Sequence, residues 1–494
     1  MSKRTADEDA AGPLKAGGRP DAMDVDDKLP ADMGEFEDEF EDEFESEDEI
    51  IEAGVDGRPD AEREAEEGAM DVDGNNGPGT FIVGRTRLEP GQTLSPDPTT
   101  YRMLHNLSTP WPCLSFDIIR DGLGDNRSVY PATMYTVAGT QAESSKASDN
   151  SIMVMKLSAL SKMQGGDESS DDEDDDDEDA DPLLEHKSIP LNTTTNRIRA
   201  HQAPGSQNPV TLTATMTEST NVFIHDITPH LASFDTPGTI ITPQQNKPIS
   251  TIRAHKSEGY AVDWSPLHPQ GKLLTGDNDG LIYVTTRSDG GGFVTDTRPF
   301  QGHTSSVEEI QWSPSEASVF ASASSDGTIR VWDVRSKSRT PALTMQVSNV
   351  DVNVMSWSKQ TTHLLASGDD AGVWGVWDLR QWKPSAAGGS VAGKPTPIAS
   401  FDYHKEQITS VEWHPTDDSI IAVSAGDNTV TLWDLAVELD DEESKDTAGV
   451  QDVPPQLLFV HYQNMAKEVH WHPQIPGVLA ATGEEFSVFR TISV

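Results

Sequence analysis

The strongest constraint on the fold is a strand-like segment containing a tryptophan, which recurs along the second half of the chain. Its five copies are VDWSP, IQWSP, MSWSK, VEWHP and VHWHP, with tryptophans at Trp264, Trp312, Trp357, Trp413 and Trp471. The tryptophans recur at nearly regular intervals, and the two longer intervals contain Pro/Gly-rich or acidic inserts. A repeat of this length is one supersecondary unit, which cannot bury its apolar face alone. The chain is therefore predicted to be built from similar units that pack side by side.

Several repeats also close with the dipeptide Trp-Asp, at Trp332, Trp377 and Trp433. His303 precedes Trp332 by the same interval that separates His404 from Trp433. These features are the signature of WD40 repeats, in which four short antiparallel strands make one blade of a β-propeller. Within a blade the His, Asp and Trp side chains can hydrogen-bond. Three positions depart from this pattern, with Thr285 and Phe489 where Trp is expected and Ala371 where Asp is expected.

Counting backward from the tryptophan repeats gives seven blades. Residues 196–227 make the second blade, and the segments ATMYTVAGT, SIMVMKLSAL and LLEHKSIPL make the first. The last repeat, ending FSVFRTISV, is one strand short. We expect residues 113–120 (CLSFDIIR) to supply that strand, because this alternating segment would close the ring and remove its exposed edges. Ahead of it, residues 98–107 are predicted to form a helix that ends before Pro110 and Pro112.

The predicted fold class is therefore all-β: a seven-bladed WD40 β-propeller with an N-terminal helix, a disordered acidic N-terminal arm and an acidic loop. The arm covers residues 1–80, whose Asp, Glu, Gly and Pro content cannot bury a core. A linker and the helix cover 81–112, and the propeller covers 113–494. Two acidic inserts interrupt the propeller, one at 161–184 in the first blade and one at 437–456 after the sixth.

The net charge constrains the partner. The chain has 83 acidic and 36 basic residues, a formal charge of −47. Residues 35–52 and 167–181 each contain twelve acids and no base, and removing these 24 charges still leaves −23. Phosphates need a Lys/Arg surface, so direct binding to nucleic acid is disfavoured and a basic protein partner is favoured. The alternative is that the acidic runs only keep the protein soluble.

Both acidic runs contain candidate interaction residues. Aromatic rings at a spacing of four would share one face of a helix, so the first run is predicted to dock on a basic partner; the alternative is a low-complexity tail with incidental aromatics. The rings are those of Phe36, Phe40 and Phe44, and the candidate acids of the second run are Asp171, Asp172 and Asp174. Serines that precede acids match the pattern of acidophilic kinases, and these are Ser46, Ser169 and Ser170.

The insert at 437–456 is the third acidic element. Two prolines stiffen it, and the acids before them could pair with Arg or Lys of a client, by which we mean a basic protein partner. These residues are Glu438, Asp440, Asp441, Glu442, Glu443, Pro454 and Pro455. In a closed ring the insert emerges near the predicted N-terminal helix, whose candidate residues are Tyr101, Leu104 and Leu107. The groove between them suits a basic amphipathic helix; the alternative is a plain solvated loop.

Two further sets of residues are candidates for binding. Residues six and four positions before the first tryptophan of a blade are expected to point to the central opening, namely Glu258, Tyr260, Glu308, Asp351 and Asn353. Arg335 and Arg380 complete Trp-Asp-x-Arg patterns, which propellers recruited as substrate receptors by cullin ubiquitin ligases also carry. An Arg or Lys often follows a closing Trp-Asp without that role.

Enzymatic signals are poor. The sequence has no Walker loop and no GxSxG motif, and Asp277-Asn278-Asp279-Gly280 lacks the spacing of a calcium loop and is interpreted as a turn. We therefore assign no catalytic, cofactor or metal residue and expect a monomeric protein that is not an enzyme. Its single cysteine, Cys113, fits a reducing compartment, and no apolar stretch has the length of a membrane span.

Particular blocks resemble known WD40 families. The segments YRMLHNLSTPWPCLSFDIIRD and DVPPQLLFVH resemble the retinoblastoma-binding, histone-chaperone class, in which a core-histone helix sits between the N-terminal helix and this loop. The segments PCLSFDIIRDGLGDNR, RPFQGHTSSVEEIQWSP, HWHPQIPG and FRTISV are similar to the glutamate-rich WD-repeat family of ribosome assembly factors. That similarity runs from about residue 80 to the last residue.

The resemblance implies a nuclear and nucleolar protein that captures its client in the cytoplasm. It implies a dedicated chaperone that binds the basic large-subunit ribosomal protein three (uL3 type) and delivers it to early pre-60S particles. Two alternatives remain open: a histone-binding chaperone or chromatin adaptor, and a ubiquitin-ligase substrate receptor.

Overall fold

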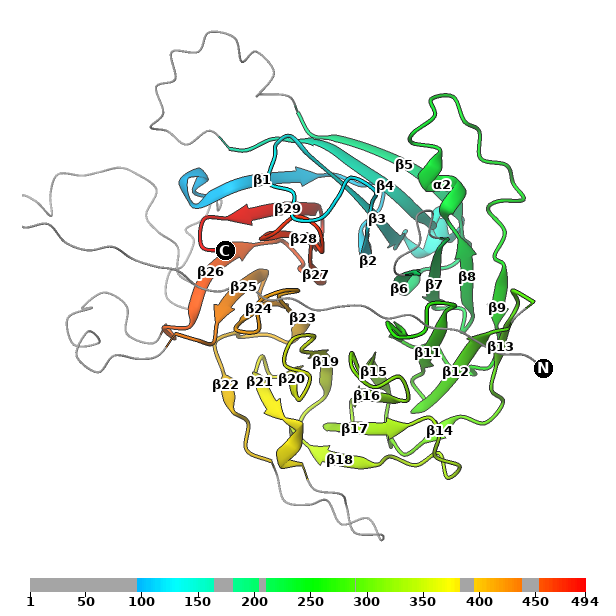
Figure 1. Cartoon of the computed structure of the whole chain (residues 1–494), viewed down its shortest axis with the longest axis vertical. Helices are drawn as coiled ribbons and strands as arrows, with labels where there is room; N and C mark the ends of the chain where they lie inside the picture. Colours follow the sequence, from blue (N-terminus) through cyan, green and yellow to red (C-terminus); the bar gives the residue numbers. More distant parts are fainter. Residues whose placement is uncertain (1–95, 164–180, 204–209, 289, 383–394, 438–452) are drawn as a thin grey trace, which may run out of the picture. The chain divides into compact units, whose positions relative to one another are not determined.

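The computed structural model describes residues 96–163, 181–203, 210–288, 290–382, 395–437 and 453–494. Within them, seven antiparallel sheets are arranged as blades around a central axis (Figure 1). The predicted seven-bladed all-β propeller is therefore confirmed. Several predicted residues lie outside the described ranges: Phe36, Phe40, Phe44, Ser46, Ser169, Ser170, Asp171, Asp172, Asp174, Glu438, Asp440, Asp441, Glu442 and Glu443.

The blades follow the order of the chain. Blade 1 contains β2 (Cys113–Ile119), β3 (Ala132–Thr140), β4 (Ser151–Leu160) and β5 (Leu183–Pro190). Blade 2 contains β6 (Thr195–Gln202), β7 (Thr211–Thr217), β8 (Val222–Asp226) and β9 (Ser250–Ile252). Blade 3 contains β10 (Ala261–Trp264), β11 (Lys272–Gly276), β12 (Leu281–Arg287), β13 (Phe293–Thr295) and β14 (Phe300–Gln301). In each blade the first of these strands lies nearest the axis (Figure 1).

The remaining blades repeat the pattern. Blade 4 contains β15 (Val307–Trp312), β16 (Val319–Ser324), β17 (Thr328–Asp333) and β18 (Leu343–Gln346). Blade 5 contains β19 (Val352–Trp357), β20 (Leu364–Asp369), β21 (Trp374–Asp378) and β22 (Ala399–Phe401). Blade 6 contains β23 (Ile408–Trp413), β24 (Ile420–Ala425), β25 (Thr429–Asp434) and β26 (Leu457–Tyr462). Blade 7 contains β27 (Glu468–Trp471), β28 (Val478–Thr482), β29 (Phe486–Thr491) and β1 (Tyr101–Leu107).

Helical segments are short. They are η1 (Pro98–Thr100), η2 (Ser144–Asp149), α2 (Thr228–Ala232) and η3 (Leu379–Gln381). None of the helices among the described residues has the length and apolarity that crossing a membrane requires.

The ring closes with β1, which pairs antiparallel with the C-terminal strand β29 from Tyr101↔Thr491 to Leu107↔Phe486. The expectation that the N-terminal part of the chain completes the last blade is therefore correct, but the strand is a different one. Residues 113–120, predicted for this role, instead form the inner strand β2 of blade 1. Blade 1 was short of an inner strand, and a segment that supplies a buried polar residue to the channel fits that place.

The predicted helix at 98–107 is wrong, because only η1 is helical and Tyr101–Leu107 is a strand. Apolar residues at 101, 104 and 107 fit a helix face, yet the same segment also fits a strand with Tyr101 and Met103 buried on one face. The local pattern does not distinguish these two structures. The unpaired edge of β29 decided between them, since pairing satisfies the backbone groups of both segments.

The repeated tryptophans hold neighbouring blades together. All five are buried, and three donate their indole N–H to an inner-strand carbonyl of the preceding blade. These bonds run from Trp264 to Arg199 O (3.0 Å), from Trp413 to Ser356 O (3.0 Å) and from Trp471 to Glu412 O (3.2 Å). Apolar clusters also lie between blades, as between blades 7 and 1 around Phe116 and Phe486. Each repeat thus buries its apolar face against the next.

The predicted hydrogen bonds within blades are present. In blade 4, His303 Nδ1 lies 3.0 Å from Asp326 Oδ2 and His303 Nε2 lies 2.7 Å from Ser322 Oγ, which accepts the indole N–H of Trp332 at 2.8 Å. In blade 6, His404 bridges a carboxylate and a hydroxyl in the same way. The blades that depart from the consensus keep parts of this set with other residues.

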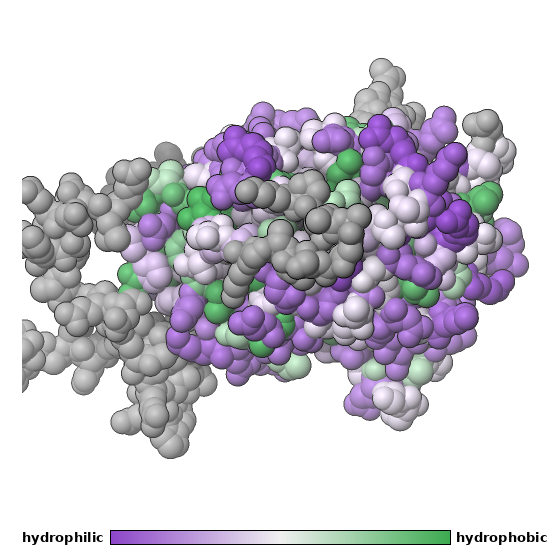
Figure 2. Space-filling model, turned by 90° about the horizontal axis from the view of Figure 1, so that it is seen from below, coloured by the Kyte–Doolittle hydropathy of each residue, from purple (hydrophilic) through white to green (hydrophobic). Residues whose placement is uncertain are grey.

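The surface of the propeller is largely polar. In the edge-on view of Figure 2, hydrophilic residues dominate and apolar residues form small, separated patches. Isolated apolar side chains are normal on the surface of a globular domain and need no binding partner.

Candidate protein-binding face and central channel

A ring of polar residues joins the blades at the centre. These residues stand one position before the repeated tryptophan or its equivalent and comprise Asp117, Arg199, Asp263, Gln311, Ser356, Glu412 and His470. Several accept the backbone N–H of the next blade. Trp312 N donates to Asp263 Oδ2 at 2.6 Å, and Ala200 N donates to Asp117 Oδ2 at 2.7 Å. The ring therefore fixes the angle between neighbouring blades.

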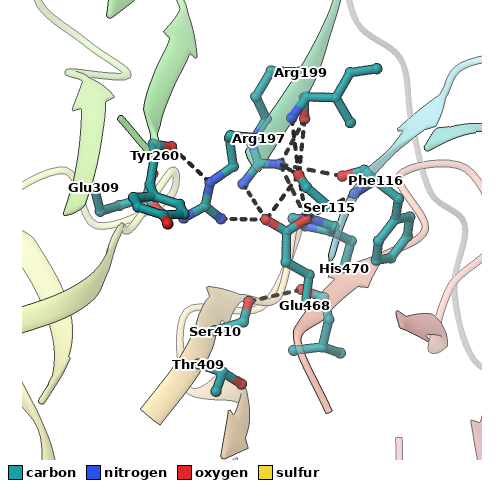
Figure 3. Close-up of polar contacts among 12 residues, drawn as sticks. Ser115, Phe116, Arg197, Arg199, Tyr260, Glu309, Thr409, Ser410, Glu468 and His470 are labelled. Atoms are coloured by element: carbon teal, nitrogen blue, oxygen red, sulfur yellow. Dashed lines mark hydrogen bonds and ion pairs between the residues drawn. The ribbon is translucent and has the colours of Figure 1, made fainter. Parts of the chain in front are cut away.

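The carboxylate of Glu468, from blade 7, is the hub of a buried charge cluster (Figure 3). Blade 1 contributes Ser115 Oγ, at 3.1 and 3.0 Å from the two carboxylate oxygens, and the N–H of Phe116 at 3.0 Å. Blade 2 contributes Arg199, at 3.2 and 3.3 Å, and Arg197, which contacts Glu468 more closely. Three blades are thus tied together at one carboxylate.

The cluster extends to both sides. Arg197 also reaches Glu309 in blade 4, with Nη2 3.3 Å from Oε2. His470 lies between two carboxylates, with Nδ1 3.0 Å from Glu412 Oε2 and Nε2 3.4 Å from Glu468 Oε2. Because both ring nitrogens face acceptors, the imidazole is doubly protonated in this arrangement.

The pKa values follow from this geometry. Burial opposes ionisation of Glu468, but the charges of Arg199 and Arg197 outweigh it and hold the pKa of Glu468 well below its usual range. Burial likewise opposes the cationic form of His470, yet the bonds to the two carboxylates raise the pKa of His470 to about 9. Burial raises the pKa of Asp263 to about 8. The cluster is thus a set of compensated charges with one carboxyl that is largely neutral at pH 7.

A cavity of about 500 Å³ lies in the channel next to this cluster. Its lining includes Trp264, Trp312, Trp357 and Trp413 together with the charged residues of the cluster. Sequence reasoning did not identify these buried charges. The available signal was a charged residue between apolar ones in the inner strands, as in VDW, VEW and EVHW, which a solvated strand would not need.

The predicted residues of the upper face, meaning the side that carries the loops with Glu258, Glu308 and Asp351, occupy loop ends and bulges. Strand pairing skips Glu308 and Asn353, because the register shifts between Val307 and Glu309 and between Val352 and Val354. A bulge turns such a side chain out of the regular pleat. The sequence position six or four before the tryptophan therefore corresponds to a structural feature.

These residues differ in how free they are. Asp351 is exposed, whereas Glu258 accepts a bond from Asn196 (3.1 Å) and Glu308 accepts one from Ser325 (2.8 Å). Asn353 Nδ2 lies 3.4 Å from Asp370 Oδ1. Burial, followed by the charges of Glu258, Glu308 and Glu218, raises the pKa of Tyr260, so carboxylates from more than one blade surround this phenol.

The residues predicted to line a groove do not form one. Tyr101 and Leu107 are buried and Leu104 is half-buried, because they belong to β1. The hydroxyl of Tyr101 lies 2.9 Å from His461 Nδ1, and its ring packs edge-on against Phe459 at 5.1 Å. Both partners are in β26, which follows the half-buried Pro454 and the exposed Pro455. Of the predicted arrangement, the neighbourhood of the N-terminal segment and the proline loop is retained.

Arg335 and Arg380 occupy equivalent places after β17 and β21. Each guanidinium binds the aspartate two residues before it, with Nη2–Oδ2 distances of 2.6 Å to Asp333 and 2.7 Å to Asp378. Hydrogen bonding from Arg380 lowers the pKa of Asp378 to about 2. The side chains of the two arginines are 73% and 66% exposed, so their outer edges are open to a partner.

Comparison with known proteins places this architecture in a family. The chain is 47% identical to ribosome assembly protein rrb1 of Schizosaccharomyces pombe over the full length of both chains. It is 41% identical to glutamate-rich WD repeat-containing protein 1 of Dictyostelium discoideum, with 87% of this chain and 89% of the relative aligned. The chain belongs to the family of these proteins.

Further similarities agree with the fold. The chain is 43% identical to protein HEAT STRESS TOLERANT DWD 1 of Arabidopsis thaliana over 82% of this chain and 90% of the relative. A model of the WD domain, G-beta repeat, matches residues 295–333 and 395–434. A model of histone-binding protein RBBP4 and the corresponding component of the CAF1 complex matches residues 91–161. That match covers β1 to β4, which close the ring and begin blade 1.

Proposed function

We propose that the chain is a ribosome assembly factor that acts by binding, without catalysis. The observation that carries this proposal is the 47% identity to ribosome assembly protein rrb1 across both full chains. We propose further that its client is a basic ribosomal protein of the large subunit (uL3 type), which it shields and delivers to early pre-60S particles. The formal charge of −47 supports this, because carboxylates can cover an rRNA-binding surface by salt-sensitive pairing.

Glu258, Tyr260, Glu308, Asp351 and Asn353 are proposed to contact the client on the upper face. The acidic runs and the proline loop would cover the rest of its basic surface. Delivery to pre-ribosomes implies that the protein works in the nucleus and nucleolus after meeting its client in the cytoplasm. Imaging of a fluorescently tagged chain tests this location, and exclusion from the nucleus would contradict it.

The test of the face is a matched pair of charge reversals. Glu258, Glu308 and Asp351 are changed to Lys in one variant, and the exposed acids Asp125, Glu316 and Asp418 in the other. The second set lies in loops after the inner strands, on the opposite face, and changes the net charge equally. Affinity for the purified ribosomal protein should fall by about tenfold or more in the first variant at ~0.1 M salt, where screening is limited, and much less in the second. Equal affinities would remove the upper face from the proposal.

Histone binding is the second candidate, because the histone-binding model matches residues 91–161. Core histones and the ribosomal protein are compared by direct competition at physiological salt. Preferential retention of histones would favour the histone-chaperone role over ribosome assembly.

A ligase-receptor role through Arg335 and Arg380 is a third candidate, supported by the exposure of both guanidinium groups on neighbouring blades. The double variant Arg335→Ala/Arg380→Ala should lose binding to a cullin-ligase adaptor in a pull-down while retaining the ribosomal protein. Retained adaptor binding would contradict this role.

A further inference from the structure

Blade 5 lacks an imidazole that blades 3, 4 and 6 all contain. In blade 3, His255 Nδ1 lies 2.8 Å from Asp277 Oδ2 and His255 Nε2 lies 2.7 Å from Thr275 Oγ1. The same ring bridges a carboxylate and a hydroxyl in blades 4 and 6. In blade 5 the equivalent residue is Ser348, which precedes Trp377 by the same interval that separates His303 from Trp332.

The groups that would hold this imidazole are nevertheless in place. Ser367 accepts the indole N–H of Trp377 at 2.8 Å, as Ser322 does from Trp332. Asp369 stands three positions before the turn glycine Gly372, the place that the blade 3 aspartate occupies before its own turn glycine. The predicted loss of the blade aspartate at Ala371 is thus compensated by Asp369. Ser348 is too short to fill the space of the missing ring.

A cavity of about 390 Å³ remains at this point. Its lining includes Ser348, Ser367, Asp369, Trp374 and Trp377. Two observations indicate that a ligand is missing from it. The indole N–H of Trp374, a residue that is 1% exposed, has no hydrogen-bond partner among the described residues. Asp369 Oδ1 accepts the N–H groups of two turn residues, but Asp369 Oδ2 accepts only Ser348 Oγ, at 2.7 Å, within the described part of the chain.

The surroundings favour a cation. Val350 and Ala371, also in the lining, are exposed. Asp351 and Asp370 are exposed beside them, and the N–H of Asp370 donates to the carbonyl of Asp351 at 2.9 Å, which brings the two loops together. The cavity therefore combines an acidic surround, a carboxylate with a free acceptor site and two indole rings. A planar guanidinium suits such a site, since it binds carboxylates through directed N–H groups and stacks on aromatic rings.

We propose that this blade 5 pocket receives an arginine side chain of the client. The guanidinium would donate to Asp369 Oδ2, where an imidazole N–H lies in blade 3, and a carbonyl of the inserted residue would accept the N–H of Trp374. The inference rests on the proposed function only in taking the client to be a basic protein. It adds a specific anchoring pocket to a face otherwise characterised by charge.

The main test fills the pocket with the residue that the other blades use. Ser348→His should restore the His–Asp–Ser–Trp set on the template of blade 4, so the variant should fold with unchanged or higher thermal stability. Its affinity for the ribosomal protein should fall about tenfold, the effect of losing one charge-assisted hydrogen bond in a buried place. The control is Ser338→His, which adds an exposed imidazole in the loop between β17 and β18 on the lower face.

A second variant keeps the test decisive if Ser348→His does not fold. Asp369→Asn retains the acceptor for the two turn N–H groups but removes the charge, and it should weaken client binding by a similar factor. If a folded Ser348→His or Asp369→Asn variant binds like the wild type, the pocket proposal is overturned. The double variant should be no weaker than Ser348→His alone, because a filled pocket no longer uses the charge.

A third measurement separates this proposal from the proposed function. If the wild-type protein does not bind the ribosomal protein, the proposed function fails but the pocket can still be tested with N-acetylarginine amide. This compound should raise the melting temperature of the wild-type protein and not that of Ser348→His. An equal effect on both proteins would overturn the pocket.

Discussion

Glu468 takes hydrogen bonds from residues of two other blades while its own strand begins blade 7. Its side chain is 3% exposed, so these bonds replace water completely. Removing one member of such a set leaves the other charges buried without a partner, which costs more than the set contributes as a whole. Residues in the channel are therefore expected to act first on stability.

The variant Glu468→Gln should lower the free energy of unfolding by about 3–5 kcal/mol, because Arg197 and Arg199 would keep their buried charges. Denaturant unfolding measures this value. The control is Glu185→Gln, which breaks the more exposed pair with Lys156 (3.8 Å) and should cost less than about 1 kcal/mol. Equal losses in the two variants would show that the cluster does not carry the stability assigned to it.

His470 gives the propeller a pH dependence. Its pKa is about 9 when folded, above the ordinary 6.5, so its contribution is complete below about pH 6.5 and is lost as the pH rises through 9. The expected loss is on the order of 3 kcal/mol. Unfolding of wild type and His470→Gln is compared at pH 6 and pH 9.5, with His186→Gln as an exposed control. The gap between wild type and His470→Gln should shrink at high pH, and a constant gap would contradict the assignment.

At the scale of elements, the decisive contact is between the first and last strands of the propeller. β1 covers the outer edge of β29, and Tyr101 inserts between Phe459, His461 and Phe489. Because these residues come from opposite ends of the chain, the ring can close only late in folding, when both ends are present. The stability of blade 7 therefore depends on one short strand near the N-terminal part of the propeller.

Tyr101→Ala should destabilise the protein by about 3–5 kcal/mol, as expected for removing a large buried ring. Tyr101→Phe keeps the ring and loses only the bond to His461, so it should cost about 1 kcal/mol. The neighbouring exposed Arg102→Ala is the control, expected to stay within about 0.5 kcal/mol. If Tyr101→Ala weakened client binding without changing the melting temperature, this residue would belong to a binding groove instead of the core.

At the scale of the whole molecule, charge and fold have separate tasks. The blades are joined around the channel by specific buried contacts, whereas 24 of the 83 acids lie in two runs without a base. Exposed charges act through a screened potential that has little dependence on exact geometry. The acidic runs are accordingly expected to shield the client more than to select it.

Replacing the twelve acids of residues 167–181 by Ser and Gly tests this division. The dependence of client affinity on salt should become shallower, since fewer ionic contacts remain, while the preference for the ribosomal protein over a control protein of equal charge persists. Titrations at ~0.1, ~0.2 and ~0.4 M salt measure both quantities. Loss of the preference itself would assign selection to the acidic run.

The sequence alone determined the seven blades, their Trp and His–Asp contacts and the sign of the charge, because these depend on a repeated local pattern with a fixed period. Tertiary structure decided what is not repeated. The segment at 101–107 fits a helix or a strand, and only the open edge of β29 selected the strand. The buried cluster at Glu468 joins strands from opposite ends of the propeller sequence, as its contact with Arg197 shows, and the blade 5 pocket arises where one side chain is too small for its place. Such features depend on which blades become neighbours, and local pattern does not encode that.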